Sequence, residues 1–403
     1  MTAFRLLGRR GLVRVFQHDA SGFAVVFVAQ PGPLVHAGLV VPTATTDDRG
    51  LAHTLEHLVF CGSQLYPRQF LDRAALRCLS SGTNAYTHED HTTYELTTAG
   101  LQGQIQALPI LLDHVLRPLL LPEDFEQEVF SLTPEQAKGV VFSEMSAREW
   151  SREDRADLAI RRLVYSPACT YHYECGGLSK DIAKLVSMDC RQFHQTWYHP
   201  SRMVAVVVGD EKAWDDAENS PQGGLLHALA KCDALNQSIT LPIPVLPITS
   251  FRDDIHQGLS ERVPFPSEDT SVGSIVFAWP GPDYADTKSF LALKVLLRYL
   301  VESDSSPMRQ AFVDVDHEHE DSDDVQSSTD VEDNESTGQD FQTAWAADVQ
   351  ADIRSYVTAS ANCDGSAVNS TTKYSDSHPA TNVRPSIPTR ISTEIVFSFK
   401  ISL

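Results

Sequence analysis

Short runs of β-branched and apolar residues alternate with segments of helical periodicity over roughly the first half of this chain. Residues 24–29 and 37–41 are rich in valine, which is typical of strands in a sheet. Residues 50–61 instead place their apolar side chains at helical spacing, and Gly62 follows them as a stop signal. This alternation predicts a folded domain that contains both strands and helices.

The same patterns continue to about residue 210. Two paired strands are expected within residues 80–98, on either side of a polar tip. Thr133 followed by Pro134 has the composition of a helix start, and it predicts a long helix that reaches about Val164, weakened locally by Gly139. Further helices are expected at 69–79, 101–118, 123–131 and 180–197, and a strand at 203–208.

Composition changes along the chain and divides it into four parts. Residues 1–225 are expected to form the first domain, and residues 226–245 a linker. Residues 246–312 begin a second region, with a strand pattern at 273–279 and a helical pattern at 287–301.

The last part, residues 313–403, is acidic and rich in Ser and Thr. It contains 17 of the 54 acidic residues but only 5 of the 32 basic ones. Such a segment buries too little apolar surface to offset its ordering entropy, so we expect it to be mostly disordered. Within it, residues 395–401 have the pattern of a strand.

The formal net charge of −22 disfavours nucleic acids and anionic membranes as partners, because both are bound mainly through Lys and Arg. No run of eighteen apolar residues is present, and the N-terminus lacks the apolar stretch of a secretory signal. The seven cysteines are odd in number and form no CxxC pair, which is typical of a reducing compartment. We therefore expect a cytoplasmic protein, and the early arginines leave a mitochondrial location as the alternative: Arg5, Arg9, Arg10 and Arg14.

The segment from His53 to His57 carries a candidate metal site. Residues four apart lie on one face of a helix, so His53 and His57 can place two imidazole nitrogens on a single zinc ion. Glu56 lies on the flank of that face, where a carboxylate can accept a proton from water without being a ligand. The alternative is a pair of solvated histidines on a surface helix.

Glu144 is the candidate third ligand, because a carboxylate among mainly apolar neighbours is costly to bury unless it is paired or binds a metal. Glu149 is a competitor, but five residues further on it points to another helix face. The pair His88 and His91 is read as solvent-exposed. Cys61, four residues after His57, is read as a buried structural cysteine rather than a thiol ligand.

The pattern HxxEH is the inverted zincin motif, and its surroundings resemble the pitrilysin/insulinase family of metallopeptidases, closest to its presequence-protease-like branch. The matching stretches are residues 47–63, 84–87, 138–145, 176–177, 193–200 and 209–210. The resemblance implies an α+β fold, in which a mainly antiparallel sheet is covered by helices on one face and repeated along the chain. It implies zinc ligation by His53, His57 and Glu144, with Glu56 as the general base.

The resemblance also implies that Asn84 and Ala85 lie on an edge strand along which an extended peptide substrate binds. The sequence departs from the family in two respects. Relatives have four such domains in two halves that close into a chamber, whereas residues 246–312 resemble only the start of the second domain. Many relatives carry a supporting glutamate where this chain has Ala137.

The expected function is therefore zinc-dependent hydrolysis of unfolded peptides, weak or absent in this chain unless a second half or another subunit completes the chamber. The alternative is a non-catalytic family member or a truncated product that acts as a zinc-binding interaction subunit. The intact set of His53, Glu56, His57 and Glu144 favours the peptidase.

Overall fold

The computed structural model describes residues 3–78, 82–134, 136–236, 259–265, 272–283, 286–303, 305–312 and 392–402. The chain separates into two compact units, residues 1–294 with 387–403, and residues 295–386. The first unit contains the expected first domain and the candidate metal site.

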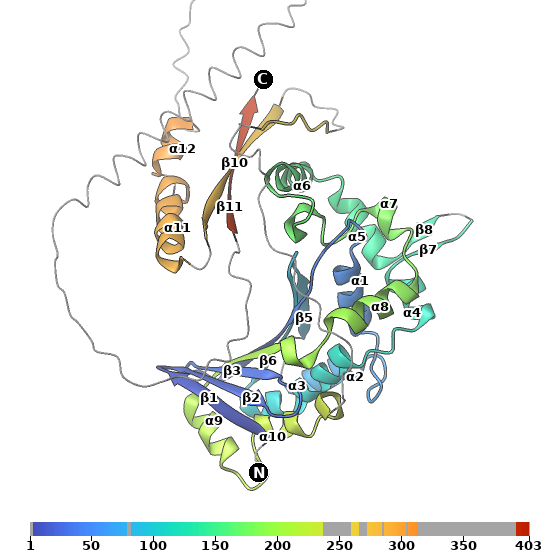
Figure 1. The fold of residues 1–403 in the computed structure, drawn as a ribbon, viewed down its shortest axis with the longest axis vertical. Helices are drawn as coiled ribbons and strands as arrows, with labels where there is room; N and C mark the ends of the chain where they lie inside the picture. Colours follow the sequence, from blue (N-terminus) through green and yellow to red (C-terminus); the bar gives the residue numbers. More distant parts are fainter. Residues whose placement is uncertain are drawn as a thin grey trace, which may run out of the picture. The chain divides into compact units, whose positions relative to one another are not determined.

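A seven-stranded sheet forms the centre of the first unit (Figure 1). Its strand order is β1-β2-β3-β9-β4-β6-β5, and every neighbouring pair is antiparallel except β3 and β9, which run parallel. The strands are β1 (Phe4–Arg10), β2 (Val13–His18), β3 (Ala24–Ala29), β4 (Leu34–Pro42), β5 (Thr83–Thr87), β6 (His91–Ala99) and β9 (Val204–Gly209). The sheet is thus mainly antiparallel, and β5 is one of its two edges.

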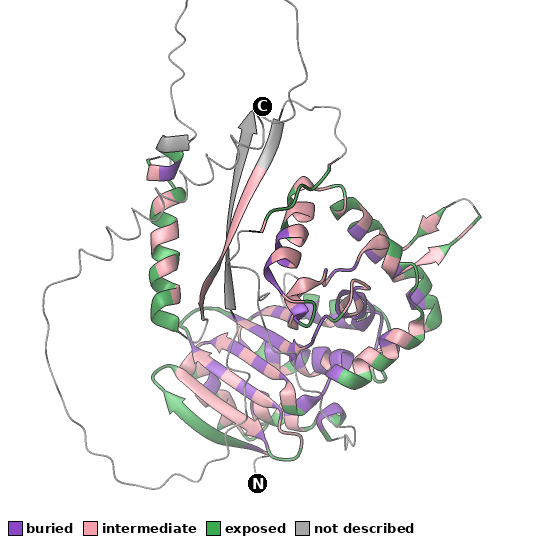
Figure 2. Cartoon of the chain, turned by 45° about the horizontal axis from the view of Figure 1, so that its top comes forward, coloured by how far each residue is buried: buried purple, intermediate pink, exposed green. Residues whose placement is uncertain are grey.

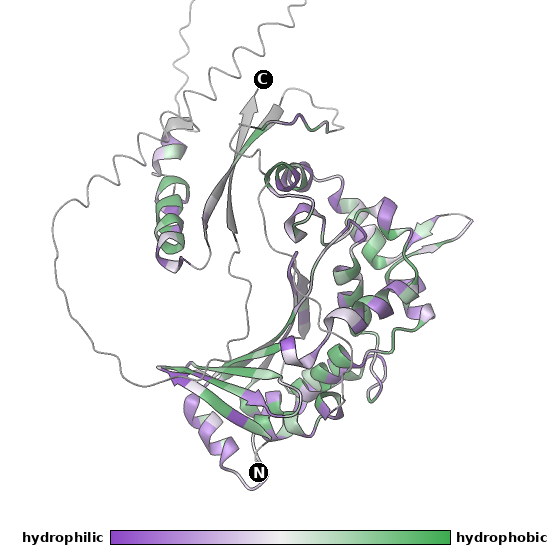
Figure 3. Ribbon diagram, in the orientation of Figure 1, coloured by the Kyte–Doolittle hydropathy of each residue, from purple (hydrophilic) through white to green (hydrophobic). Residues whose placement is uncertain are grey.

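One face of this sheet is buried and forms the main core. In β3, Val25, Phe27 and Ala29 are buried while the residues between them are partly exposed, and β9 alternates in the same way (Figure 2). The buried face joins leucines of α3 (Leu101–Leu116), such as Leu108 and Leu111, in one hydrophobic cluster. Figure 3 shows hydrophobic residues both on the central strands and on the helices that pack beside them. The period of two along each strand therefore decides which face the helices cover.

The remaining helices of this part of the chain include the expected ones at 50–61, 69–79 and 123–131, and they differ from the expectation elsewhere. They are α1 (Leu51–Val59), α2 (Phe70–Arg77), α4 (Pro122–Glu128), α5 (Val140–Arg148), α6 (Arg152–Val164), α7 (Ser179–Ile182), α8 (Ser187–Trp197), α9 (Glu211–Glu218) and α10 (Leu225–Ala230), with short 3-10 turns η1 (Thr170–His172), η2 (Pro200–Arg202) and η3 (Asp233–Asn236). The predicted helix over 180–197 is two helices, α7 and α8.

The prediction of one long helix from Pro134 to Val164 is wrong. Thr133 instead stabilises a turn, because its hydroxyl accepts a hydrogen bond from the Gln136 amide, between the short strands β7 (Ser131–Leu132) and β8 (Ala137–Lys138). Gly139 then begins α5 at φ 138°, a conformation that favours glycine. A second start follows at Ser151, whose side chain accepts from the Asp154 amide and caps α6.

The expected end of the first domain at residue 225 is also too early. Helix α10 and η3 follow that point, and Leu229 and Leu235 are buried in the main core cluster. The linker assigned to 226–245 therefore begins after Asn236, and its remaining residues lie outside the described part of the chain.

The later segments form β10 (Val272–Asp283), α11 (Thr287–Val301), α12 (Pro307–Phe312) and β11 (Ser392–Ser402). Strand β11 contains the predicted strand at 395–401 and pairs antiparallel with β10. The partial second domain expected over 246–312 is divided between the two units. The expected disorder of residues 313–391 concerns residues outside the described ones.

Candidate metal centre

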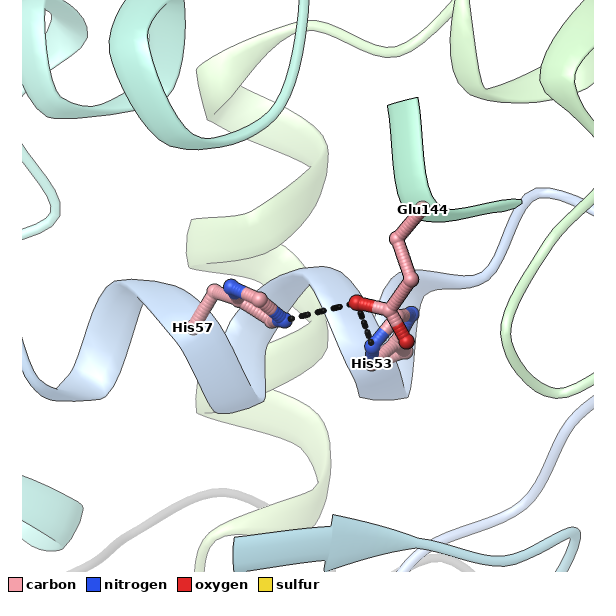
Figure 4. Close-up of side chains that lie close together, drawn as sticks. All are labelled: His53, His57 and Glu144. Atoms are coloured by element: carbon pink, nitrogen blue, oxygen red, sulfur yellow. Dashed lines mark ion pairs between the residues drawn. The ribbon is translucent and has the colours of Figure 1, made fainter. Parts of the chain in front are cut away.

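Helix α1 presents the two histidines of the motif on one side. It begins after Gly50, which adopts φ 68°, and it is anchored by residues such as Leu55 and Leu58 that are buried in the core. His53 and His57 are one turn apart, and their rings meet edge to face with centroids 4.9 Å apart. Figure 4 shows both imidazoles on α1 directed toward Glu144. The helix therefore holds the pair as the four-residue spacing predicts.

Glu144 reaches the two histidines from α5, a separate helix. Its Oε2 atom lies 3.7 Å from Nε2 of His53 and 3.7 Å from Nε2 of His57 (Figure 4). The three ligand atoms lie within 4.8 Å of one another. The sequence prediction that Glu144 joins the histidines agrees with this geometry.

This donor set fits a zinc ion. Zinc binds imidazole nitrogen and carboxylate oxygen at about 2.0–2.2 Å in a tetrahedral arrangement, so two ligands of one ion are separated by somewhat less than twice that distance. The 3.7 Å separations between Glu144 and each histidine meet this requirement with a small adjustment. Two neutral imidazoles and one carboxylate leave a fourth position open, as in catalytic rather than structural zinc sites.

The histidines are held differently. Nδ1 of His53 lies 3.2 Å from the carbonyl oxygen of Gly176, so the ring donates there and leaves Nε2 free to bind a metal. Within the described residues, no hydrogen bond to Nδ1 of His57 is present. Ala137, where the resemblance implied a supporting glutamate, lies in β8 rather than on the helix of Glu144.

Electrostatics favour neutral imidazole at His57. Burial and the neighbouring His53 together lower the pKa of His57 to about 4, against the opposing effect of the Glu144 carboxylate. A neutral imidazole is the form that ligates a metal.

Glu56 lies beside the metal ligands without joining their cluster. Its Oε2 accepts a 2.6 Å hydrogen bond from the hydroxyl of Thr87, at the end of β5. Burial raises the pKa of Glu56, while the bond from Thr87 lowers it. A partly buried carboxylate with a raised pKa is suited to accepting and returning a proton.

The competing ligands are engaged elsewhere. Both carboxylate oxygens of Glu149 accept hydrogen bonds from Ser179. His88 is exposed and His91 is paired with Asp90 at the hairpin tip, apart from the three-residue cluster. Cys61 is buried, and burial raises the pKa of its thiol to about 12. In the described part of the chain, Glu144 is therefore the carboxylate that lies beside both histidines.

Asn84 and Ala85 lie on the edge strand β5, as the resemblance implied. They line a groove of about 410 Å³ together with Glu56 and His57. The exposed edge of a sheet thus runs beside the candidate metal site.

Several residues around the site were not found from the sequence. Thr87 and Gly176 belong to stretches that were noted only for their resemblance, whereas Glu174 and Arg161 were not singled out. Arg161 and Glu174 form a buried ion pair of 2.8 Å. Arg161 could have been found from the sequence, because it is a charged residue on the apolar side of an amphipathic helix.

Comparisons with known proteins place the chain in a family. Residues 25–153 match the family described as Insulinase (Peptidase family M16), and residues 185–338 match the Peptidase M16 inactive domain. An uncharacterized protein of Caenorhabditis elegans is 34% identical over 292 residues, covering 70% of this chain and 28% of the relative. A mitochondrial presequence protease of Mus musculus is 29% identical over 309 residues, covering 74% of this chain and 29% of that protein.

Solved structures agree on the fold. A protease from Helicobacter pylori superposes with a TM-score of 0.61 at 21% identity, covering 75% of this chain and 68% of that one. A putative M16-like peptidase from Alicyclobacillus acidocaldarius gives a TM-score of 0.52 at 20% identity, with the same coverages. The matches to the two family models thus place the protein in the peptidase M16 class. The chain belongs to the insulinase-like (M16) family, and it spans less than a third of the length of its curated relatives.

Among the described residues, no helix is both long and apolar enough to cross a membrane. The six cysteines in the described part of the chain, all except Cys363, are free thiols.

Proposed function

We propose that this chain carries the zinc-dependent active site of a metalloendopeptidase that hydrolyses unfolded peptides. The observation that carries the proposal is the convergence of His53, His57 and Glu144 from two helices, with Glu56 beside them. The residues lie within the segment that matches the insulinase family, whereas the match to the inactive domain covers residues 185–338.

When bound, zinc supplies a Lewis acid that polarises a peptide carbonyl and makes water more acidic. The chain itself supplies the base. Oε2 of Glu56 is occupied by the Thr87 hydroxyl, so the other carboxylate oxygen is the one available to take a proton from the attacking water and pass it to the leaving amine.

Strand β5 is proposed to bind the substrate. No strand of the described residues pairs with its outer edge, so an extended peptide can add to it through main-chain hydrogen bonds. Asn84 and Ala85 on this strand line the groove that also contains Glu56 and His57. Such binding makes little demand on substrate sequence, which suits a peptidase of unfolded chains. A peptide methylated on one main-chain amide near its cleaved bond should bind more weakly than the unmethylated peptide.

A second half, on another chain or subunit, is proposed to complete the site. This chain covers 28% and 27% of two uncharacterized relatives, from Caenorhabditis elegans and Saccharomyces cerevisiae. An isolated part of a larger enzyme can bind zinc and still fail to position substrate. The cytoplasm is the proposed location, and the similarity to mitochondrial presequence proteases supports the mitochondrion as the alternative.

The test is metal analysis combined with peptide hydrolysis on matched variants of the full chain. The unmodified chain and His88→Ala are expected to bind one zinc ion, whereas His57→Ala loses it. Glu56→Gln is expected to keep zinc and to abolish any hydrolysis shown by the chain or its assembly. Full zinc occupancy in His57→Ala would overturn the ligand assignment. Zinc binding without hydrolysis, even in a completed assembly, would favour a non-catalytic interaction subunit.

A further inference from the structure

We infer that Arg161 and Glu174 are positioning residues for the metal ligand His53, acting through the main chain of Gly176. The inference rests on the proposed function, since it concerns the same site. Neither residue touches the metal-ligand cluster, and the effect passes through hydrogen bonds in series.

The first step is the contact between His53 and the loop. Nδ1 of His53 donates to the carbonyl oxygen of Gly176, which fixes the tautomer and the ring plane. The orientation of this imidazole therefore depends on where the loop places one carbonyl group. Gly176 is also packed tightly, because a Cβ atom there would lie 2.6 Å from Sδ of Met145, the residue after Glu144.

The second step fixes the loop. Oε1 of Glu174 accepts a 3.1 Å hydrogen bond from the amide of Gly176, and the Glu174 amide donates to Oδ1 of Asp48 at 3.0 Å. The Gly177 amide in turn donates to the Glu174 carbonyl at 3.1 Å. The peptide groups around Gly176 are thus held by the side chain and the main chain of one glutamate.

The third step anchors Glu174 to α6. Nη2 of Arg161 donates to Oε2 of Glu174 at 2.8 Å. The same guanidinium donates to Oε1 of Glu89 at 3.0 Å and to Oδ2 of Asp157 at 2.8 Å. It also donates to the carbonyl oxygen of Tyr173 at 2.6 Å. Arg161 is buried, and the surrounding carboxylates raise its pKa against the opposing effect of burial. The guanidinium has no freedom to turn, so it holds Glu174 in one place.

The pair of Arg161 and Glu174 is better suited to fixing geometry than to adding stability. A buried ion pair gains little net stability, since the cost of removing both charges from water offsets their attraction. A planar guanidinium with five donors can instead hold several acceptors at fixed angles. Glu89 lies two residues from Thr87, so Arg161 also links the loop that orients His53 to the hairpin that contacts Glu56.

The experiment measures zinc dissociation constants by chelator competition on four variants of the full chain: Arg161→Met, Glu174→Gln, their double variant and Arg161→Lys. Each of the first two should weaken zinc binding about 10- to 100-fold, as loss of an outer-shell partner typically does. The double variant should bind zinc no more weakly than the weaker-binding single variant, because both substitutions interrupt the same series of hydrogen bonds. Arg161→Lys keeps the positive charge but lacks the planar set of guanidinium donors. Its zinc binding should therefore also be weaker than that of the unmodified chain.

A matched control and a second readout separate positioning from folding. Arg14→Met removes another nearly buried arginine, paired with Asp215 and Glu211 on α9, and it should leave zinc affinity unchanged. Circular dichroism and thermal unfolding of the zinc-free proteins check folding. Cobalt(II) in place of zinc should show altered ligand-field bands in Arg161→Met and Glu174→Gln, but not in Arg14→Met.

The outcomes distinguish this inference from the proposed function. Suppose that the unmodified chain binds zinc tightly and that Arg161→Met and Glu174→Gln both bind it within twofold of the same affinity. That result would overturn this inference and leave the proposed function standing. Full recovery in Arg161→Lys would also overturn the inference, because charge rather than geometry would then suffice. Failure of the unmodified chain to bind zinc would overturn the proposed function and the inference together.

Discussion

The hydroxyl group of Thr87 donates a 2.6 Å hydrogen bond to Oε2 of Glu56, which joins the edge hairpin to the helix of the metal motif. The bond selects which carboxylate oxygen of Glu56 remains available to water. It also connects the strand proposed to bind substrate with the proposed base.

Thr87→Val removes this bond with little change in shape. Hydrogen bonds to charged groups contribute about 1.5–3 kcal/mol, so we expect kcat of an active assembly to fall roughly 10- to 100-fold. Zinc content should stay unchanged, because Thr87 contacts no metal ligand. Thr87→Ser retains the hydroxyl and should retain most activity. Equal loss of zinc and activity in Thr87→Val would contradict this role.

Gly50→Ala should be much more damaging than Gly11→Ala. Both glycines have positive φ, 68° and 56°, so alanine costs about 1–2 kcal/mol at either position. At Gly50 the added Cβ would also lie 2.7 Å from Cα of Gly177 and closer still to the Gly176 oxygen, whereas nothing lies within 4 Å at Gly11. Overpacking adds about 1–3 kcal/mol. Urea unfolding of both variants measures the difference, and equal losses would show that the contact is not tight.

His194 should make the free energy of unfolding depend on pH. Burial lowers the pKa of His194 to about 4 in the folded protein, against an ordinary value of 6.5, despite the bond of its Nε2 to the Val115 carbonyl oxygen. The unfolded chain therefore binds a proton between these values and the folded chain does not. The part of the unfolding free energy that neutral His194 contributes at pH 7 is lost as pH falls from about 6.5 to about 4. No more of it is lost below pH 4.

The measurement compares the zinc-free chain with His194→Gln, which can still donate to Val115. The difference in unfolding free energy between the two proteins should shrink as pH falls from 7 to 5. A difference that stays constant with pH would show that folding does not change the pKa of His194.

The isolated chain should hydrolyse a quenched unstructured peptide slowly or not at all. Zinc and Glu56 can act on water, but positioning of the scissile bond supplies several kcal/mol of barrier lowering, and this chain spans under a third of its relatives. Addition of a partner half should raise chelator-sensitive turnover. Turnover by the monomer alone at about 1 per second or faster would show that it is a complete catalyst.

The candidate metal ligands could be chosen from local signals, because these residues lie on helices. The spacing of His53 and His57 determines their common face, and Glu144 was identified by its apolar neighbours. The error between Pro134 and Val164 arose where local signals conflicted. Proline at an expected helix start was followed by Gly139, and the glycine marks the true beginning of the helix.

Long-range partners could not be predicted from one sequence. Arg161 reaches Glu89, and His53 reaches Gly176, across separations over which no local pattern carries information. The parallel pairing of β3 with β9 is of the same kind, since both strands have an alternating valine pattern that suits any place in a sheet.

The place of β9 in the sheet has a consequence for biosynthesis. Strands β3 and β4 are consecutive in the chain, yet β9 lies between them, with Ala205 paired to Val25 on one side and to Leu39 on the other. The sheet therefore stays open until the ribosome has released residue Gly209, and contacts of such high sequence separation form slowly. A nascent chain that ends before β9 should expose β3 and β4 as free edges and depend on chaperones. Metal loading is accordingly expected to follow synthesis of the whole first domain.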